Sequence, residues 1–505
     1  MRAGVAAAAR GSPSLTADRA EGFRALFEPR GVAVAGASSH PGKFGFVALH
    51  NILRHDFPGR VFAISLGGED VLDLKPLRSA DELPHGAADL VVVCTPPPAN
   101  VELLRACGAR GVKAAFVTTA GYGEAGAAGV RAEAELIATA DELGILLAGP
   151  NGQGLISTPA SLCAQIVAPY PPPGRIAIVS QSGNFVSSFM NFAIQTGIGV
   201  SRAVSAGNAA ATTVADYLAY YADDPATAVS LAYVEGLADG RAFFERLRPL
   251  AARKPIVLLK GGASPGGASA AASHTGALAS DDRIFDGACR QAGVVRAATV
   301  EEAFEAAATF ATQPYPRGPR VVVYTSAGGW GVVTADAISR TSLELLPLPE
   351  DLREDLDARL PPRWSRNNPV DLAGGETRDT IPECMELIAR HPQVDAMIYL
   401  GMGIQSNEAR IMRTGRFWPG HGLERIVGYH ERQDARFAEA AAAASEATGK
   451  PVLTATELAV THPDNPGPAT VRETGRLCYA SANRAVTALE HLWRYARWRQ
   501  RRGLE

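Results

Sequence analysis

The chain has 505 residues, 47% of them hydrophobic and 20% charged, and a formal net charge of -3. This length predicts three or four domains, and the composition is typical of a globular protein rather than a disordered one. The near-neutral charge gives no reason to expect nucleic acid or an anionic membrane surface as a partner.

Cysteine spacing and apolar run length exclude two further classes. Six cysteines are scattered singly and no CxxC pair occurs, so we expect no zinc site or redox motif and assign no metal ligands. No apolar run reaches the ~18 residues of a membrane-spanning helix. We therefore expect a cytoplasmic protein with reduced thiols. Residues 1–22 begin with an Ala- and Arg-rich stretch without a clear amphipathic repeat, which predicts a disordered tail rather than a transit peptide.

A first domain is predicted over residues 23–165. A short apolar strand at 32–35 runs into a turn of small residues and a helix start, which together contain Gly36, Ala37, Ser38, Ser39 and Lys43. A buried strand, a small-residue turn and a helix N-terminus form a unit that can cradle phosphate. The turn is not a GxGxxG sequence, so a dinucleotide site is only weakly indicated.

The following strands alternate with helical stretches, which predicts a parallel, doubly wound sheet. The strands are expected at 61–64, 89–94, 114–118 and 145–148. The residues that follow three of them are small or rigid and include Pro97, Thr119, Ala120, Gly121 and Asn151. Each turn alone is ordinary turn chemistry. Together with the turn at Gly36 they favour a nucleotide-like ligand, because ligands of such sheets lie outside the carboxyl ends of the strands.

A second domain is predicted over residues 174–312, after a Pro-rich break at 169–173. Its first strand ends near Ser182 and Gly183, where a helix should begin with free N–H groups, although N-capping by serine explains the same residues. A strand at 228–234 ends in Glu235, which a solvated charge would explain equally well. A strand at 255–259 leads into a Gly-rich segment that carries His274.

His274 lies between two hydroxyl residues and a glycine, so its imidazole should be uncovered. A neutral imidazole is a good nucleophile near neutral pH, and we interpret His274 as a covalent relay for a phosphoryl group. An incidental histidine in a polar loop is the alternative. Three strand ends would bring Ser182, Glu235 and His274 to one rim. A carboxylate there would fix the imidazole tautomer, and the helix N-terminus would stabilise a phosphoryl group.

A third domain is predicted over residues 318–505. A strand at 321–324 ends in a Gly-rich turn, a further strand is expected at 396–400, and the last short strand should begin at 452. The final helix is expected at 480–500, because its apolar residues recur at helical spacing.

In their order along the chain, these segments resemble the alpha subunits of the NDP-forming acyl-CoA synthetases, which are related to succinyl-CoA synthetase. The matching motifs are Gly36-Ala37-Ser38, Gly149-Pro150-Asn151, Ser180-Gln181-Ser182-Gly183, Ser205-Ala206-Gly207-Asn208, Ser273-His274-Thr275-Gly276, Ala327-Gly328-Gly329 and Asn368-Pro369-Val370-Asp371. The resemblance implies an α/β protein with an N-terminal Rossmann-like CoA-binding domain followed by two flavodoxin-like doubly wound domains.

The resemblance also implies roles for individual residues. His274 would be the phosphorylated histidine and Glu235 would orient it, while Ser182 and Gly183 would begin the helix that holds the phosphoryl group. Coenzyme A would lie over the small-residue turns of the first domain: Gly36, Ala37, Ser38, Ser39, Lys43, Pro97, Thr119, Ala120, Gly121 and Asn151. The acyl pocket is expected near Phe185 and Ser187.

The implied reaction interconverts acyl-CoA, phosphate and NDP with a carboxylic acid, CoA and NTP through an acyl phosphate. Family members need an ATP-grasp domain, and no GxxxxGK[ST] sequence replaces it here. We therefore expect a hetero-oligomer with an ATP-grasp beta subunit that holds Mg²⁺ and ATP or ADP. The alternative is a non-catalytic CoA- or acyl-CoA-binding protein that keeps the ligase scaffold. A Rossmann oxidoreductase is disfavoured, because no acidic residue for a ribose follows the second strand.

Overall fold

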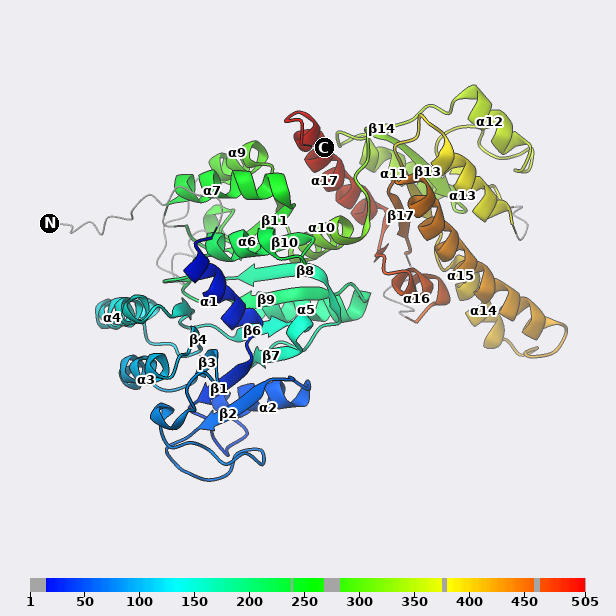
Figure 1. Cartoon of the computed structure of the whole chain (residues 1–505). Helices are drawn as coiled ribbons and strands as arrows, with labels where there is room; N and C mark the ends of the chain where they lie inside the picture. Colours follow the sequence, from blue (N-terminus) through cyan, green and yellow to red (C-terminus); the bar gives the residue numbers. More distant parts are fainter. Residues whose placement is uncertain (1–14, 238, 268–281, 375–378, 458–463, 505) are drawn as a thin grey trace. The chain divides into compact units, whose positions relative to one another are not determined.

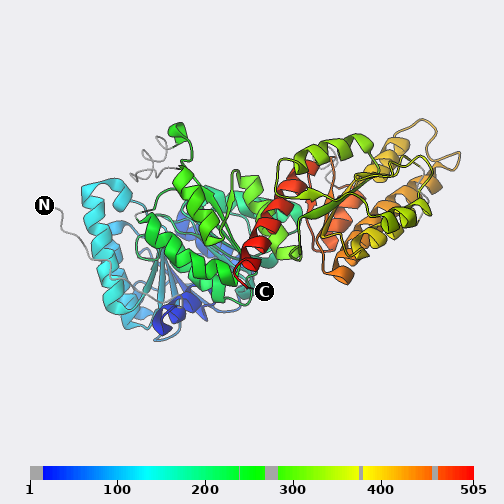
Figure 2. The same ribbon diagram turned by 90° about the horizontal axis from the view of Figure 1, so that it is seen from above.

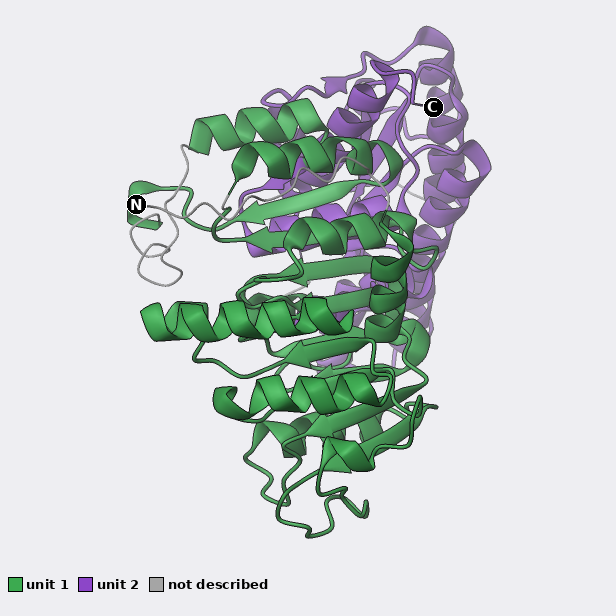
Figure 3. Cartoon of the chain, turned by 60° about the vertical axis from the view of Figure 1, so that its left-hand side comes forward, with its two compact units in different colours: residues 1–190, 200–294 green, residues 191–199, 295–505 purple. Residues whose placement is uncertain are grey.

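The computed structural model describes residues 15–237, 239–267, 282–374, 379–457 and 464–504 (Figure 1). The chain forms two compact units, residues 1–190 with 200–294 and residues 191–199 with 295–505 (Figure 3). The first unit contains two sheets and the second unit contains one, so the three parallel-sheet domains expected from the sequence are confirmed. Within the described ranges, no helix has the length and apolar character needed to cross a membrane.

The first sheet has five parallel strands in the order β2-β1-β3-β4-β5. The strands are β1 (Gly31–Ala35), β2 (Arg60–Ile64), β3 (Leu90–Val93), β4 (Ala114–Val117) and β5 (Leu146–Ala148). The connecting helices are α2 (Phe44–Arg54), α3 (Pro97–Ala109) and α4 (Ala127–Leu143), with short 3-10 turns η1 (Ala80–Glu82) and η2 (Gly123–Ala125). Every residue of β1, β3 and β4 is buried, which explains why these strands are continuous apolar runs.

The chain becomes helical earlier than the sequence indicated. Helix α1 (Ala17–Phe27) begins inside the segment 1–22 that we expected to be a disordered tail, and Thr16 caps it by accepting a hydrogen bond from Arg19 N. The helix is held because the rings of Phe23 and Phe27 stack on Tyr220 at 4.9 and 5.4 Å. The expectation is therefore wrong for residues 17–22, while residues 1–14 lie outside the described part of the chain.

The second sheet of the first unit contains β11, β10, β8, β9, β6 and β7 in that order. The strands are β6 (Gly154–Ser157), β7 (Leu162–Gln165), β8 (Pro173–Ser180), β9 (Val200–Ser205), β10 (Val229–Val234) and β11 (Ile256–Lys260), with η3 (Thr158–Ala160) between β6 and β7. We predicted that the first domain extends to residue 165. In the structure, β6 pairs antiparallel with β9 and with β7, so residues 154–165 contribute two strands to the second sheet. The Pro-rich stretch at 169–173 does not separate the two sheets, because it leads from β7 into β8 of the same sheet.

Adjacent strands β8 and β10 send their following helices to opposite faces of the second sheet. The helices are α5 (Gly183–Thr196), α6 (Val214–Asp223), α7 (Gly240–Arg253) and α9 (Asp282–Ala292). α6 packs on β8 and β10, α7 packs on α6, and α9 packs on α7. On β10, Tyr233 contacts Phe185 of α5, whereas its neighbour Val234 faces α7 and α9. Successive strand residues point to opposite faces, so a topological switch point lies between β8 and β10.

The second unit is built on parallel strands in the order β14-β13-β16-β17-β18, with β15 also paired to β13. Its strands are β13 (Arg320–Thr325), β14 (Glu344–Leu345), β15 (Val370–Asp371), β16 (Ala396–Leu400), β17 (Val452–Ala455) and β18 (Cys478–Tyr479), whereas β12 (Val295–Ala297) is the edge strand of the second sheet. β18 follows β17, so the strand at 452 is not the last one. β18 has only 2 residues, so the sequence shows no alternation of apolar and polar residues from which it could be predicted.

Helices cover the sheet of the second unit, and α14 and α15 run side by side as a long pair (Figures 1 and 2). The helices are α10 (Val300–Thr312), α11 (Gly328–Ile338), α12 (Glu350–Asp357), α13 (Thr380–Arg390), α14 (Ile404–Arg413), α15 (Leu423–Thr448), α16 (Pro466–Glu473) and α17 (Ala482–Gln500). α10 packs against α17, and the ion pair between Arg484 and Glu305 at 2.8 Å joins the two helices.

Candidate functional site

The turn after β1 is packed so tightly that two of its positions require glycine. Gly36 has a φ of +82°, and a Cβ built there would lie 2.8 Å from the carbonyl oxygen of Cys94. A Cβ on Gly45 would lie 2.0 Å from the carbonyl oxygen of Gly36. The start of α2 therefore rests directly on the turn, as in sites where a helix N-terminus faces an anion.

The amides of this turn are not all available to a ligand. The N–H groups of Gly36 and Ala37 both donate to Ile64 O at 3.1 Å, which ties the turn to β2. Lys43 is the exposed N-cap residue of α2, and the first intrahelical bonds run from Phe46 and Val47 to its carbonyl oxygen. An anion would thus be met by the first-turn amides of α2 and by Lys43 rather than by Gly36 and Ala37.

The two serines of the turn hold the loop that leads into α2. Ser38 Oγ accepts a hydrogen bond from His40 N at 3.1 Å, and Ser39 Oγ donates to Glu69 at 3.0 Å. Both residues stay at the surface or half-buried, so they lie on the rim where the sequence placed them.

The other predicted rim residues of the first sheet come together at the same edge. Pro97 is the first residue of α3, and a Cβ on Gly121 would contact it at 3.4 Å. Thr119 Oγ1 donates to Thr95 O at 2.7 Å, and Asn151 N donates to Thr119 O at 3.1 Å. Ala120, Gly121 and Asn151 are exposed. The carboxyl ends of β1, β3, β4 and β5 thus form one accessible rim.

Asn208 connects this rim to the second sheet, a role that we did not assign from the sequence. Its Oδ1 accepts a hydrogen bond from Asn151 Nδ2 at 3.3 Å. Its Nδ2 donates to Glu124 at 2.6 Å and to Glu133 at 2.8 Å. The signal was present as the Ser205–Asn208 motif, but the motif does not say which side chains it meets.

At the switch point of the second sheet, Gln181 binds the ends of both strands. Its Oε1 accepts hydrogen bonds from Glu235 N at 2.6 Å and from Gly236 N at 3.4 Å, and its own N–H donates to Tyr233 O at 3.2 Å. Ser182 N donates to Ser180 Oγ at 3.1 Å just before α5 begins at Gly183. Gln181 therefore joins the backbone of Glu235 to the end of β8, two residues before α5 begins at Gly183.

Tyr233 holds the side chain of Glu235. Its hydroxyl hydrogen-bonds to the Glu235 carboxylate, and burial, reinforced by that charge, holds the pKa of Tyr233 far above its usual value. The phenol therefore stays protonated and acts as a donor. On its other side, the ring packs against Phe185 with centroids 4.2 Å apart. Sequence reasoning missed both Gln181 and Tyr233, although Tyr233 precedes Glu235 by two residues and so shares its face of β10.

His274 lies outside the described residues, but both ends of the segment that carries it are defined. Gly261 follows β11, and its N–H donates to Val234 O at 2.8 Å. A Cβ at Gly261 would lie 2.6 Å from the Tyr233 hydroxyl oxygen. The segment returns at Asp282, where α9 begins and where Lys260 Nζ lies 3.6 Å from the carboxylate. Gly261 therefore lies beside Glu235, and Asp282 lies beside Lys260.

Across the described ranges, His, Cys, Asp and Glu side chains form no group of three that could hold a metal ion. The six cysteines are all free, and four of them are buried.

Comparisons with known proteins agree with this architecture. The CoA binding domain family matches residues 30–157, the succinyl-CoA ligase-like flavodoxin domain family matches 173–310, and the Ligase-CoA domain family matches 321–404. The alpha subunit of acetate–CoA ligase [ADP-forming] II from Pyrococcus furiosus is 38% identical over 373 residues, which is 74% of this chain and 81% of the relative. A trans-feruloyl-CoA synthase from an unknown prokaryotic organism is 33% identical over 353 residues, 69% of this chain and 50% of the relative.

A solved structure is similar over nearly the whole chain. The dinucleotide-forming acetyl-coenzyme A synthetase 1 of Ca. Korarchaeum cryptofilum, in complex with phosphate and ADP, superposes with a TM-score of 0.82 at 30% identity. The match covers 95% of this chain and 98% of that one.

The three family matches, in this order along the chain, identify the ligase class of CoA-binding α/β proteins. The chain belongs to the alpha-subunit family of the ADP-forming acetyl-CoA synthetases, with a CoA-binding domain, a succinyl-CoA ligase-like flavodoxin domain and a Ligase-CoA domain.

Proposed function

We propose that the chain is the alpha component of an NDP-forming acid–CoA ligase. It interconverts acyl-CoA, phosphate and NDP with a carboxylic acid, CoA and NTP. The observation that carries the proposal is the hydrogen bond between Gln181 and Glu235 at the switch point, beside Gly261, from which the chain leads to His274. A ligand of a doubly wound sheet lies at such a point.

The reaction runs in three steps, each of which breaks one bond and forms another. A phosphate oxygen attacks the thioester carbon, which releases CoA thiolate and leaves an acyl phosphate. A nitrogen of His274 then attacks phosphorus, which releases the carboxylate and gives a phosphohistidine. Finally, a terminal oxygen of NDP takes the phosphoryl group and frees the imidazole. Positioning and charge stabilisation dominate such transfers.

Three residues of this chain support the second step. Glu235 stabilises the positive charge on His274 and fixes its tautomer. Ser182 and Gly183 begin α5, whose N-terminal amides and dipole stabilise the phosphoryl oxygens.

CoA lies along the rim of the first sheet in this proposal. Its phosphates meet the start of α2 and Lys43, and the remainder of the molecule follows the small-residue turns around to Asn151. The residues assigned to it are Gly36, Ala37, Ser38, Ser39, Lys43, Pro97, Thr119, Ala120, Gly121 and Asn151. Phe185 and Ser187 lie on α5, next to the expected position of the acyl carbonyl group.

The nucleotide is assigned to a partner. Two curated relatives, 38% and 37% identical to this chain, are named subunit alpha, which implies a second subunit in those enzymes. We assign to that subunit an ATP-grasp fold, Mg²⁺ and ATP or ADP, and we place the complex in the cytoplasm.

Phosphoryl labelling tests the proposal. The chain is incubated with labelled phosphate and a panel of acyl-CoA thioesters, with and without the ATP-grasp partner, beside the variants His274→Ala and Glu235→Gln. We expect an acid-labile, base-stable label that is absent from His274→Ala and forms more slowly in Glu235→Gln. If no thioester gives a label while CoA still binds, the chain is a non-catalytic CoA-binding protein on a ligase scaffold.

A further inference from the structure

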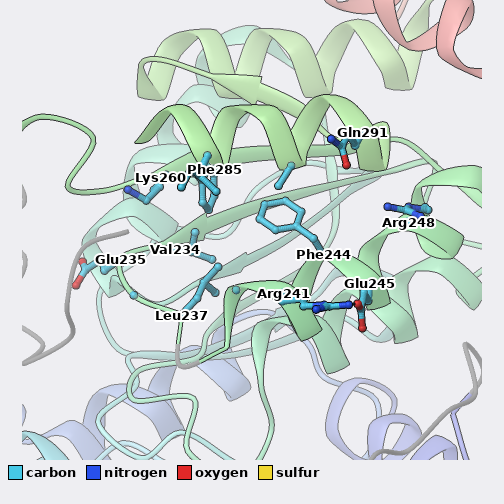
Figure 4. Close-up of a pocket in the computed structure, with 14 residues that line it drawn as sticks. Val234, Glu235, Leu237, Arg241, Phe244, Glu245, Arg248, Lys260, Phe285 and Gln291 are labelled. Carbon is cyan, nitrogen blue, oxygen red and sulfur yellow. The ribbon is translucent and has the colours of Figure 1, made fainter. Parts of the chain in front are cut away.

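A cavity of about 430 Å³ opens between α7 and α9 (Figure 4). It begins at the carboxyl ends of β10 and β11, where Glu235 and Lys260 lie, and extends between the two helices toward Arg248 and Gln291. This end, called the inner end below, is thus lined by Lys260, the last residue of β11, whose ammonium lies near Asp282 at the start of α9.

The inner end carries a buried positive charge. The Lys260 side chain is 5% exposed, and its Nζ lies 3.6 Å from Asp282 Oδ1 and 5.2 Å from the ring centroid of Phe285. The Lys260 Nζ also donates to Gly262 O at 3.4 Å. A charge-assisted bond is normally ~2.7–2.9 Å long and an ammonium has three donors, so these two long contacts leave donor capacity for a ligand. Lys260 is the register partner of Val234, which puts it one strand away from Glu235. A carboxylate is the ligand group that a buried ammonium in this position favours.

The walls beyond Lys260 are apolar and partly aromatic. They are formed by Val234, Leu237, Phe244, Ile284, Phe285 and Ala288. The rings of Phe244 and Phe285 meet edge to face with centroids 5.2 Å apart, which leaves an apolar wall against which a third ring can pack. Acetate occupies about the volume of three water molecules of ~30 Å³ each, which is much less than the volume of this cavity. The cavity can therefore hold a larger acid.

We propose that this cavity holds the organic group of the acid substrate. The carboxylate lies at Lys260, beside Glu235, and an aryl or branched apolar body of about six to ten carbons fills the space between Phe244 and Phe285. The inference rests on the function proposed above and names its substrate class. It also moves the organic group away from Phe185, which packs on Tyr233 at the opposite face of the sheet.

Substrate preference in the reconstituted complex tests the inference. Thioester formation is measured with acetate and with phenylacetate for the wild-type chain, for Ala288→Phe, which fills the cavity from α9, and for Gly287→Ala as a control. A Cβ at Gly287 meets nothing within 4 Å, and Gly287 does not line the cavity. We expect the wild type to prefer phenylacetate in kcat/KM. Ala288→Phe should lower the ratio of phenylacetate to acetate activity at least tenfold, and Gly287→Ala should leave it unchanged.

Binding without turnover gives a second readout. Titration calorimetry with phenylacetate alone should show binding to the full chain, and Lys260→Met should weaken it at least tenfold. If Ala288→Phe lowers both acids equally, or if Phe185→Leu rather than Ala288→Phe changes the preference, the acyl group lies along α5 and the inference is overturned while the ligase function stands. If the wild-type complex makes no thioester from any acid and His274 takes no label, the proposed function itself fails.

Discussion

The side-chain oxygen of Gln181 lies 2.6 Å from the backbone nitrogen of Glu235, so a single amide group binds together the ends of β8 and β10. These strands are adjacent in the sheet, but Gln181 and Glu235 are 54 positions apart in the sequence. The hydrogen bond fixes the backbone of Glu235, and Tyr233 fixes its carboxylate. Glu235 is therefore oriented before any ligand arrives.

Replacing Gln181 by Leu should slow phosphorylation of His274 by about 10- to 100-fold, because small misplacements of a reacting geometry carry costs of that size. The loss should appear in kcat more than in the KM for CoA, which binds to another sheet. The matched control is Gln195→Leu, an exposed side chain near the end of α5, the helix that follows Gln181. Equal rates in the two variants would remove Gln181 from the positioning role.

Replacing Tyr233 by Phe removes the hydroxyl but keeps the ring that packs on Phe185. We expect a loss of about three- to tenfold in the labelling rate, since a hydrogen bond to a charged group is worth about 1.5–3 kcal/mol and water can replace part of it. Tyr221→Phe is the control, because that hydroxyl donates to Ile178 O at 2.9 Å inside the same domain. The control should lower the melting temperature without changing the rate, and the reverse pattern would contradict the assignment.

Replacing Asn208 by Asp places a third carboxylate against Glu124 and Glu133. Repulsion should break the link to Asn151, and we expect the KM for CoA to rise about tenfold, as like charges in contact cost a few kcal/mol. Asn407→Asp adds the same charge on α14, where Arg410 can pair with it, and should leave the KM unchanged. An effect confined to stability, with CoA affinity intact, would make Asn208 purely structural.

Replacing Gly45 by Ala forces a methyl group against Gly36 O, since the two atoms would lie 2.0 Å apart. We expect a loss of about 1–3 kcal/mol in the free energy of unfolding and weaker CoA binding, because the start of α2 must move away from the turn. Gly287→Ala adds the same methyl group in open space on α9 and should stabilise by up to about 1 kcal/mol. Urea unfolding of both variants measures the change in stability, and CoA titration measures the change in affinity.

The second unit should carry a pH dependence that comes from Asp434. This carboxylate accepts hydrogen bonds from Ser406 N at 2.6 Å and Gly403 N at 3.3 Å, and burial raises its pKa from 3.8 to about 6. Between those two values the folded state binds a proton that the unfolded state has lost. The stability that this group contributes is thus complete below about pH 4 and is lost as the pH rises through 6.

Asp434→Asn removes this titration. Relative to the wild type, the variant should gain about 2–3 kcal/mol in the free energy of unfolding between pH 4.5 and 7.5, at ~1.4 kcal/mol for each unit of pKa difference. Urea unfolding of both chains at the two pH values measures the change. His430 also faces Asp434, so His430→Gln is carried alongside to separate its charge from the carboxylate. A difference between wild type and Asp434→Asn that does not vary with pH would contradict the assignment.

Much of the fold could be predicted because buried parallel strands appear in the sequence as continuous apolar runs. The strands that contain Val32, Val91 and Ile398 were predicted within a residue or two of their ends. Strand ends were also informative, since parallel strands present their carboxyl ends to one edge. Thr119 and Asn151 follow different strands and are hydrogen-bonded to each other, and Gln181 and Glu235 are likewise hydrogen-bonded where β8 and β10 end.

The errors share a physical cause, which is that pairing partners are not encoded locally. β6 and β7 lie among residues assigned to the first domain, yet they pair with β9 of the second sheet. Gln181 could not be recognised, because its role depends on β8 lying next to β10. The hydroxyl of Tyr233 could have been anticipated from its spacing to Glu235, but not its contact with Gly261.

The contact between Gly261 and Tyr233 restricts which residue can follow β11 on the way to His274. At position 261 any side chain would strike the phenol of Tyr233, whereas at Gly266, five residues later, the space around the Cβ position is open. In a library of all twenty amino acids, selection for ligase activity should return glycine alone at 261 and a broad mixture at 266. The chain between β11 and His274 can therefore vary in sequence at position 266, but not at position 261, where it leaves the sheet.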